Sequence, residues 1–88
     1  MSKSISSRQL KAALALLRWN VSDLAEASGV SQPTIWRLET TDGPIGGKPE
    51  TAEAVIGALE GAGIIFIEEN GEGFGVRLRK SKRSKARG

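Results

Sequence analysis

The chain has 88 residues and a net charge of +3, and it contains neither cysteine nor histidine. This length is typical of one small domain, and the missing residue types exclude a disulfide framework, cysteine-type zinc sites and histidine as a general base. We therefore expect no enzyme: no catalytic residues, no metal ligands and no cofactor.

The charges are distributed unevenly along the chain. Residues 41–76 contain seven acidic residues and one lysine, whereas residues 77–88 contain seven basic residues and no acidic one. No apolar segment approaches the roughly 18 residues that a membrane helix needs, and no secretion signal is visible. The sequence therefore predicts a cytoplasmic protein with no membrane partner.

The first predicted helix follows a flexible arm at residues 1–5. Ser6 and Gln9 are spaced as a capping box, in which each side chain binds the backbone N–H of the other residue. Apolar residues then recur every three or four positions, as on the buried face of a helix. These residues are Leu10, Ala13, Leu14 and Leu17. We expect this helix to end at Trp19 and Asn20.

The second and third predicted helices are short and are joined through a glycine. Asn20 and Asp23 again have capping-box spacing. Gly29 is expected to end the second helix, because glycine adopts the left-handed conformation at little cost. Ser31 then caps a third helix, Gln32 to Glu39. The expected apolar face of the second helix consists of Leu24, Ala25 and Ala27.

The rest of the chain changes from helix to hairpin. After a loop at residues 40–48, a fourth helix is predicted from Thr51 to Gly61. Its inward residues are Ala52, Val55, Ile56 and Leu59. Residues 64–79 predict a β-hairpin, because a β-branched run and an alternating run flank the turn-favouring pair Asn70-Gly71. The predicted fold class is mainly α, with four helices, a C-terminal hairpin and a basic tail at residues 80–88.

The second and third helices have the spacing of a helix-turn-helix. Two short helices that cross steeply need a small residue at the crossing, a glycine in the turn and apolar residues after it. The residues that satisfy this pattern are Ala25, Gly29, Val30, Ile35 and Leu38. The second helix of this motif enters the DNA major groove. The alternative is that the two helices only pack together in a small helical domain.

The run from Ala25 to Ile35, followed by Leu38 and Glu39, resembles the lambda-repressor-like family of bacterial and phage regulators, also called the xenobiotic-response-element or Cro-type family. The resemblance covers about residues 6–62 and implies a four-helix DNA-binding domain over residues 6–63. Two positions depart from the family pattern: Val21 and Leu14 stand where relatives usually carry glutamine and arginine.

The resemblance also implies contacts with double-stranded DNA. Gln32 matches a base-reading position, and an amide side chain can bind an adenine edge with two hydrogen bonds. Arg37 reads guanine or holds a phosphate, and Trp36 contacts sugars or a thymine methyl unless it is half-buried core. The expected base-reading residues, on one outward face, are Gln32, Thr34, Trp36 and Arg37. The expected phosphate contacts are Ser22, Ser31, Pro33, Thr40 and Lys48.

The basic tail has three interpretations. It is a solvated end, an extension that binds phosphates without sequence preference, or a segment that folds onto the acidic residues 41–76. Its expected phosphate contacts are Arg79, Lys80, Lys82, Arg83, Lys85 and Arg87.

We therefore expect a sequence-specific, homodimeric repressor, because one recognition helix reads few base pairs and two-fold pairing doubles the site. The hairpin is the expected dimer element, through exposed strand edges and the residues Ile65, Ile67, Phe74, Val76 and Leu78. The alternative function is a protein-interaction module, such as an antitoxin or a phage-encoded adaptor, whose hairpin and acidic segment bind a protein partner.

Overall fold

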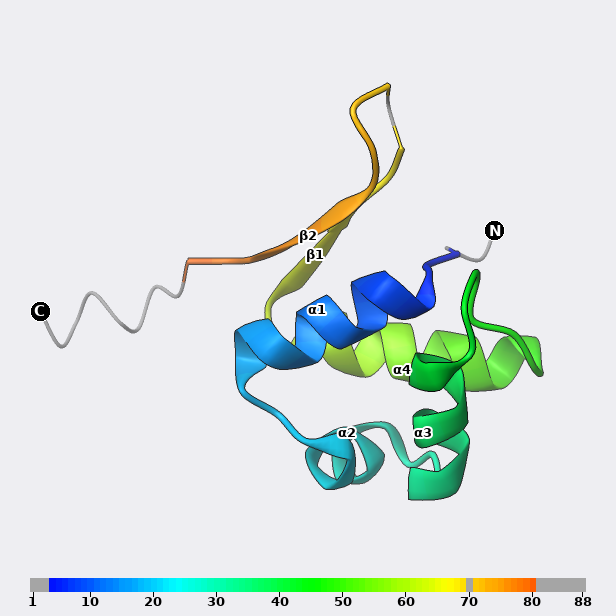
Figure 1. The fold of residues 1–88 in the computed structure, drawn as a ribbon. Helices are drawn as coiled ribbons and strands as arrows, with labels where there is room; N and C mark the ends of the chain where they lie inside the picture. The colour runs from blue at the N-terminus through cyan, green and yellow to red at the C-terminus, as the bar shows by residue number, and fades with distance from the viewer. Residues whose placement is uncertain (1–3, 70, 81–88) are drawn as a thin grey trace, which may run out of the picture.

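A computed structural model describes residues 4–69 and 71–80 of the chain. Within these residues the chain forms four helices followed by two strands (Figure 1). Their bounds are α1 Ser7–Leu17, α2 Val21–Ser28, α3 Gln32–Thr40, α4 Pro49–Gly61, β1 Ile64–Ile67 and β2 Gly75–Leu78. The mainly helical fold with a two-stranded hairpin is confirmed.

The starts of α1 and α2 are closed by the two predicted capping boxes. The Ser6 hydroxyl accepts from the Gln9 N–H at 3.1 Å, and the Gln9 amide oxygen accepts from the Ser6 N–H at 2.9 Å. Asn20 and Asp23 form the same reciprocal pair at 3.0 and 2.9 Å. α1 ends two residues before the predicted Trp19, because Arg18 adopts a left-handed conformation with φ 60°.

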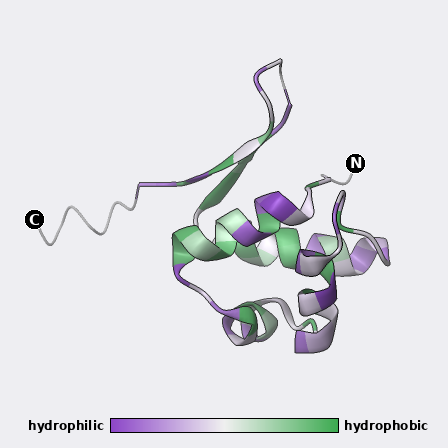
Figure 2. Ribbon diagram, viewed as in Figure 1, coloured by the Kyte–Doolittle hydropathy of each residue, from purple (hydrophilic) through white to green (hydrophobic). Residues whose placement is uncertain are grey.

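One apolar core joins all four helices and β1. Its fully buried side chains are Leu10, Leu24, Ile35, Val55, Leu59 and Ile64. Figure 2 shows hydrophobic segments where α1, α4 and β1 lie together, whereas the hairpin tip is hydrophilic. The prediction for Ala27 is wrong: it is exposed, because Leu24 and Ala25 already supply the inward side of α2.

Two predicted boundaries also differ. α4 begins at Pro49, two residues before the predicted Thr51, since proline suits a first helical position whose N–H needs no acceptor. The predicted arm at residues 1–5 is wrong at its last residue. Ile5 is 2% exposed, and its carbonyl accepts from the Ile45 N–H at 2.9 Å. Residues 1–3 lie outside the described residues.

The hairpin is tied to the helices through Gln9. Besides its part in the capping box, the Gln9 amide nitrogen donates to the carbonyls of Ile67 at 3.3 Å and Gly75 at 3.0 Å. The strands pair antiparallel, with Ile64 opposite Leu78 and Phe66 opposite Val76. Cross-strand partners share a face, so these four residues form the face that lies on the helices.

The predicted dimer residues therefore do not share one face of the hairpin. Val76 is half-buried and packs against the core, with Phe74 and Leu78 on the same side of the strand. Ile65 and Ile67 alternate with the buried Ile64 and Phe66, so they lie on the opposite face. Asn70, the first residue of the predicted turn, lies outside the described residues.

Candidate nucleic-acid interface

The turn between α2 and α3 has the geometry that the sequence predicted. Gly29 caps α2 in the left-handed conformation with φ 78°, and its N–H donates to the Ala25 carbonyl at 2.8 Å. Leu24 and Ile35, one from each helix, are fully buried. The Ser28 side chain also stabilises the turn: its hydroxyl donates to the Leu24 carbonyl at 2.7 Å and accepts from the Val30 N–H at 3.2 Å.

Burial of Ile35 and Leu38 turns the opposite side of α3 outward. Gln32, Trp36 and Thr40, which follow one another at four-residue spacing, are all exposed, and Trp36 is exposed by 60%. Because residues four apart lie on one face of a helix, these side chains form a single outward stripe. The exposure of Trp36 decides between its two predicted roles: it is not part of the core.

An open hollow of about 580 Å³ lies beside this stripe. Val21 at the start of α2 lines it together with Gln32, Pro33 and Trp36 of α3. Its walls are mostly apolar, and Gln32 is the one lining residue with an amide side chain. Such a surface can contact a ligand that carries an apolar group next to hydrogen-bond donors or acceptors. The valine that departs from the family pattern is thus part of the same surface as Gln32.

A second hollow of about 470 Å³ lies on the other side of α3. Arg37 and Thr34 line it from α3, and Lys48 lines it from the residue before α4, although the two cations are eleven positions apart in the chain. Thr34 and Arg37 line this hollow, whereas Gln32 and Trp36 line the first one, so the prediction that all four share one outward face is wrong. Thr34 is half-buried there, and Arg37 is exposed.

Most of the hydroxyls predicted to bind phosphate already donate within the protein. Ser22 donates to the Asn20 amide oxygen at 2.6 Å, and Thr40 donates to the Trp36 carbonyl at 2.8 Å. A phosphate oxygen only accepts, so these two hydroxyls are not arranged to bind one. Ser31 and Thr34 bind each other at 2.9 Å, which leaves one hydroxyl proton of the pair for an outside acceptor.

The first turn of α3 is open to a phosphate in another way. Ser31 makes no side-chain cap, and Pro33 has no N–H. In the described part of the chain, the backbone N–H groups of Gln32 and Thr34 have no acceptor. Unpaired N–H groups at a helix start attract anions, because the helix dipole adds a partial positive charge there.

Most residues of the predicted phosphate-binding tail lie outside the part of the chain that the structure describes. Arg79 and Lys80 are exposed beyond β2, and Lys82, Arg83, Lys85 and Arg87 lie outside the described residues. Within residues 4–69 and 71–80, no three acidic side chains are grouped to hold a metal ion, and no helix there is long and apolar enough to cross a membrane.

Sequence reasoning missed three features of this surface: Ser28, Val21 and the approach of Lys48 to Arg37. Ser28 could have been predicted, because a serine directly before a turn glycine often binds nearby backbone groups through its hydroxyl. The other two depend on contacts between separate elements.

A scan of protein-family models finds no match to this chain, and a search of curated proteins finds no similar sequence.

Proposed function

We propose that the protein is a sequence-specific DNA-binding regulator of the lambda-repressor-like kind, a cytoplasmic repressor that binds DNA as a homodimer. α3 enters the major groove with its outward stripe against the base edges. Gln32 binds a base edge, Trp36 and the Val21 hollow receive a thymine methyl or sugar, and Arg37 reads guanine or binds the backbone. The observation that carries this proposal is the exposed stripe of α3 beside its uncapped N-terminus.

The backbone contacts assist this arrangement. The N–H groups of Gln32 and Thr34 receive one phosphate, and Arg37 and Lys48, which share one hollow, receive the next along the strand. The basic residues that follow β2 add affinity that is independent of sequence and falls with salt. Together they offset the repulsion between DNA and the seven acidic residues of positions 41–76.

The experiment that tests this function is selection of random-sequence duplexes by the full chain at about 0.15 M salt, read by sequencing. The expected result is an enriched palindrome whose half-sites lie about one helical turn apart. Arg37→Gln is expected to relax one position of that site or to weaken it uniformly, whereas Arg77→Gln, which removes the same charge on the hairpin, leaves the base preference unchanged.

Two results would contradict the proposal. No enrichment despite salt-sensitive binding would mean that the basic residues after β2 alone contact DNA. If Arg37→Gln changed neither the base preference nor the affinity more than Arg77→Gln does, α3 would not be the reading element. In either case the protein-interaction alternative becomes the better explanation of the acidic segment and the hairpin.

A further inference from the structure

An open cavity of about 510 Å³ lies where the start of α1, the loop after α3 and the tip of the hairpin meet. It shares no lining residue with the two hollows beside α3, so the proposed DNA-binding surface does not include it. Its volume is within the range of small-molecule sites, about 300–1,000 Å³. The chemistry of its walls decides which ligand it can hold.

Hydrogen bonds between these three segments fix the walls of the cavity. The Ser7 N–H donates to the Gly43 carbonyl at 2.8 Å, which joins the start of α1 to the loop. The Gln9 side chain donates to the carbonyls of Ile67 and Gly75, which joins α1 to the hairpin. Because the walls are already held together, a ligand binds there without first having to order them.

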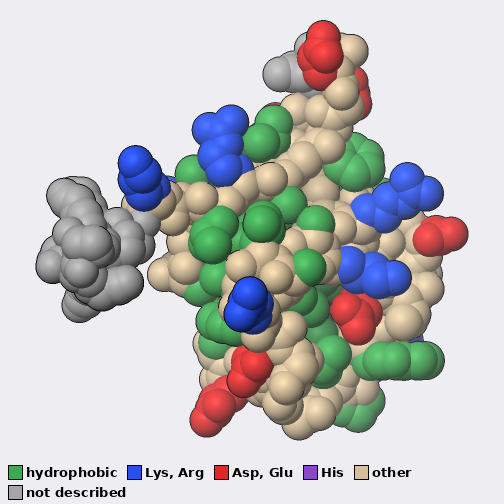
Figure 3. All heavy atoms as spheres, turned by 60° about the vertical axis from the view of Figure 1, so that its left-hand side comes forward, with side chains coloured by type: hydrophobic (Ala, Val, Ile, Leu, Met, Phe, Trp, Pro, Cys, Tyr) green, Lys and Arg blue, Asp and Glu red, His purple; other side chains and the backbone are tan. Residues whose placement is uncertain are grey.

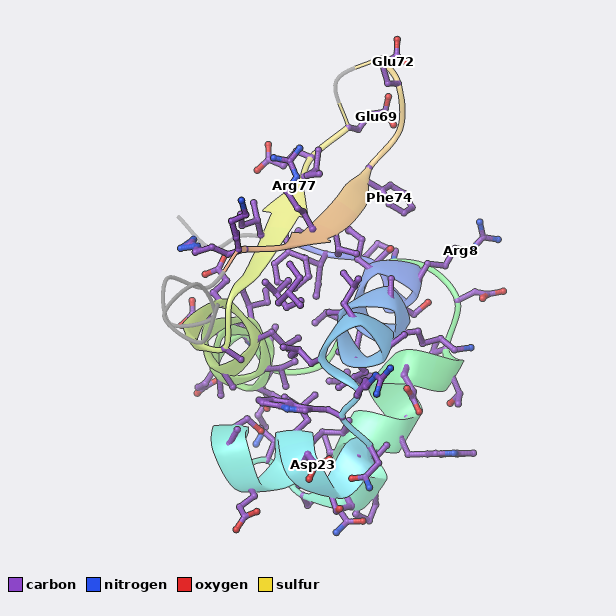
Figure 4. All side chains as sticks on the ribbon, turned by 90° about the vertical axis from the view of Figure 1, so that its left-hand side faces the viewer. Arg8, Asp23, Glu69, Glu72, Phe74 and Arg77 are labelled. Atoms are coloured by element: carbon purple, nitrogen blue, oxygen red, sulfur yellow. The ribbon has the colours of Figure 1, made fainter. Side chains whose placement is uncertain are left out.

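The hairpin supplies an aromatic ring and a carboxylate on the same side. The last strand pair is Ile67 with Gly75, and the next step of this register places Glu68 opposite Phe74. Opposite residues of an antiparallel pair share a face, and both of these side chains line the cavity. The Phe74 ring is exposed by 47%, and Figure 4 shows it on the α1 side of the hairpin. A ligand in the cavity therefore meets the ring and the carboxylate together.

The charges of the cavity are mostly negative. Among the described residues that line it, Asp42, Glu68 and Glu69 carry carboxylates and Arg8 alone is basic. Glu69 already accepts two backbone N–H groups within the tip, at 2.9 and 3.2 Å, where Figure 3 shows acidic side chains. The Asp42 and Glu68 side chains are exposed, and they accept no hydrogen bond and form no ion pair within the described residues. These two carboxylates are therefore available to a cation.

Apolar surface makes up most of the remaining wall. Ile5 and Pro44 line the cavity together with Phe74. Such walls disfavour a hydrated metal ion, because they would displace its water without offering oxygen ligands in return. An organic cation fits better, since its apolar body can leave water while its charge stays beside a carboxylate. A cation near the face of an aromatic ring is also attracted by the electrons of the ring.

We propose that this cavity is a binding site for a small organic cation, an aromatic amine or amidine. The ring of the ligand packs on Phe74 and Pro44, and its positive group lies beside the Glu68 and Asp42 carboxylates. Arg8 carries the same charge as the ligand and therefore limits its affinity. The site goes beyond the proposed function, because it includes no residue of α3 and needs no DNA.

Three probes that share a benzene ring test the charge of the ligand. Benzamidinium is positive, benzamide is neutral and benzoate is negative. Each probe is titrated into the full chain without DNA, and the backbone amide shifts are followed by NMR. Benzamidinium is expected to bind with a Kd of about 1 mM, and the other two at least about tenfold more weakly. The largest shifts are expected at residues 4–9, 42–44 and 71–74.

Charge variants with opposite expected signs locate the positive group of the ligand. Glu68→Gln is expected to weaken benzamidinium binding about threefold or more, because an attracting carboxylate is lost, whereas Arg8→Gln is expected to strengthen it about twofold. The matched controls are Glu26→Gln on α2 and Arg77→Gln on the hairpin, which remove the same charges at positions that do not line the cavity. Both controls are expected to leave the Kd nearly unchanged.

Removal of the aromatic ring tests the apolar contact. Phe74→Ala is expected to weaken benzamidinium binding about tenfold, because the ligand loses the surface on which its ring packs. Trp36→Ala removes the exposed aromatic side chain of α3 and is the control that leaves binding unchanged. If Phe74→Ala unfolds, the opposite signs of Glu68→Gln and Arg8→Gln still test the site, since both side chains are exposed.

Three results would overturn the proposal: equal affinity for the three probes, a preference for benzoate, or shifts centred on Trp36 and not on the cavity. The test is independent of the DNA selection. Benzamidinium binding at the cavity without an enriched DNA site would support this inference and refute the proposed function, and an enriched palindrome without benzamidinium binding would do the reverse.

Discussion

The four helices start in two different ways. α1 and α2 are each closed by a reciprocal capping box, whereas α3 and α4 begin with a proline in the first turn and have no side-chain cap. The residues that precede α3 and α4 are Ser31 and Lys48. Ser31 has a hydroxyl that could cap, yet it binds the Thr34 hydroxyl instead.

This difference divides the helices by role: α1 and α2 support the fold, whereas α3 and α4 start at the proposed DNA-binding surface. A cap stabilises a helix by satisfying its first N–H groups, but it also takes those groups away from any ligand. The capped helices are α1, which binds the hairpin through Gln9, and α2, which leads into the turn at Gly29. The helices without a side-chain cap are α3, which starts at Gln32, and α4, which starts next to Lys48 at the hollow shared with Arg37. The comparison predicts that stability and DNA binding respond to changes at different helix starts.

The largest expected effect is on base reading by α3. Gln32→Ala is expected to weaken binding to the preferred site by about 1–3 kcal/mol and to relax one base position, because two hydrogen bonds to a base edge are lost. Titration of the preferred duplex and a set of single-base variants measures both quantities. An unchanged affinity and an unchanged preference would show that α3 docks in another register.

Closing the start of α3 is expected to move stability and binding in opposite directions. In Ser31→Asp, a carboxylate at the cap position stabilises the helix by about 0.5–1 kcal/mol, but it occupies the Thr34 N–H and repels phosphate. DNA affinity should fall about tenfold or more, which corresponds to about 1.4 kcal/mol. Urea unfolding and DNA titration of the same preparation check the two signs.

The control for this change is Asn20→Asp at the start of α2. That cap is already formed, so little gain in stability is expected, and the acidic side chain blocks no N–H that was open. If Asn20→Asp lowered DNA affinity as much as Ser31→Asp, charge alone, and not the open helix start, would explain the loss.

Removing a cap is expected to matter only where a cap exists. Asn20→Ala should destabilise the fold by about 1 kcal/mol, because the Asp23 N–H loses its acceptor. Ser31→Ala should change stability by less than about 0.5 kcal/mol, since its side chain caps nothing. Urea unfolding of both variants measures the difference, and equal destabilisation would remove the distinction between closed and open helices.

The smallest expected effect comes from the start of α4. Lys48→Gln should weaken all DNA sequences alike and reduce the slope of log affinity against log salt by about 0.9, the value for one lost phosphate contact. Titrations at several salt concentrations measure the slope. A change in base preference with an unchanged slope would place Lys48 at a base and not at the backbone.

Local features of the fold were predicted well from the sequence. The capping boxes at Ser6 and Asn20, the left-handed Gly29 and the hairpin pairing are all present. The caps and the turn depend on residues only a few positions apart, and the hairpin joins two neighbouring segments, so spacing along the chain is sufficient to predict them. The outward stripe of Gln32 and Trp36 follows in the same way from the burial of Ile35 and Leu38.

Features that join distant segments were decided by the tertiary structure. Sequence spacing predicts the capping role of Gln9 but not its bonds to Ile67 and Gly75, because those carbonyls are brought to it by the docking of the hairpin. Likewise, Ile5 is buried, and its carbonyl accepts a hydrogen bond from Ile45, forty positions further along the chain.

The candidate interface divides along the same line. The sequence by itself determined that α3 follows a tight turn and shows Gln32 outward, since short-range spacing controls both. Only the tertiary structure placed Lys48 and Arg37 at one hollow and set Val21 beside Trp36. The physical reason is that hydrogen bonds within a turn act over a few residues, whereas packing selects neighbours from the whole chain.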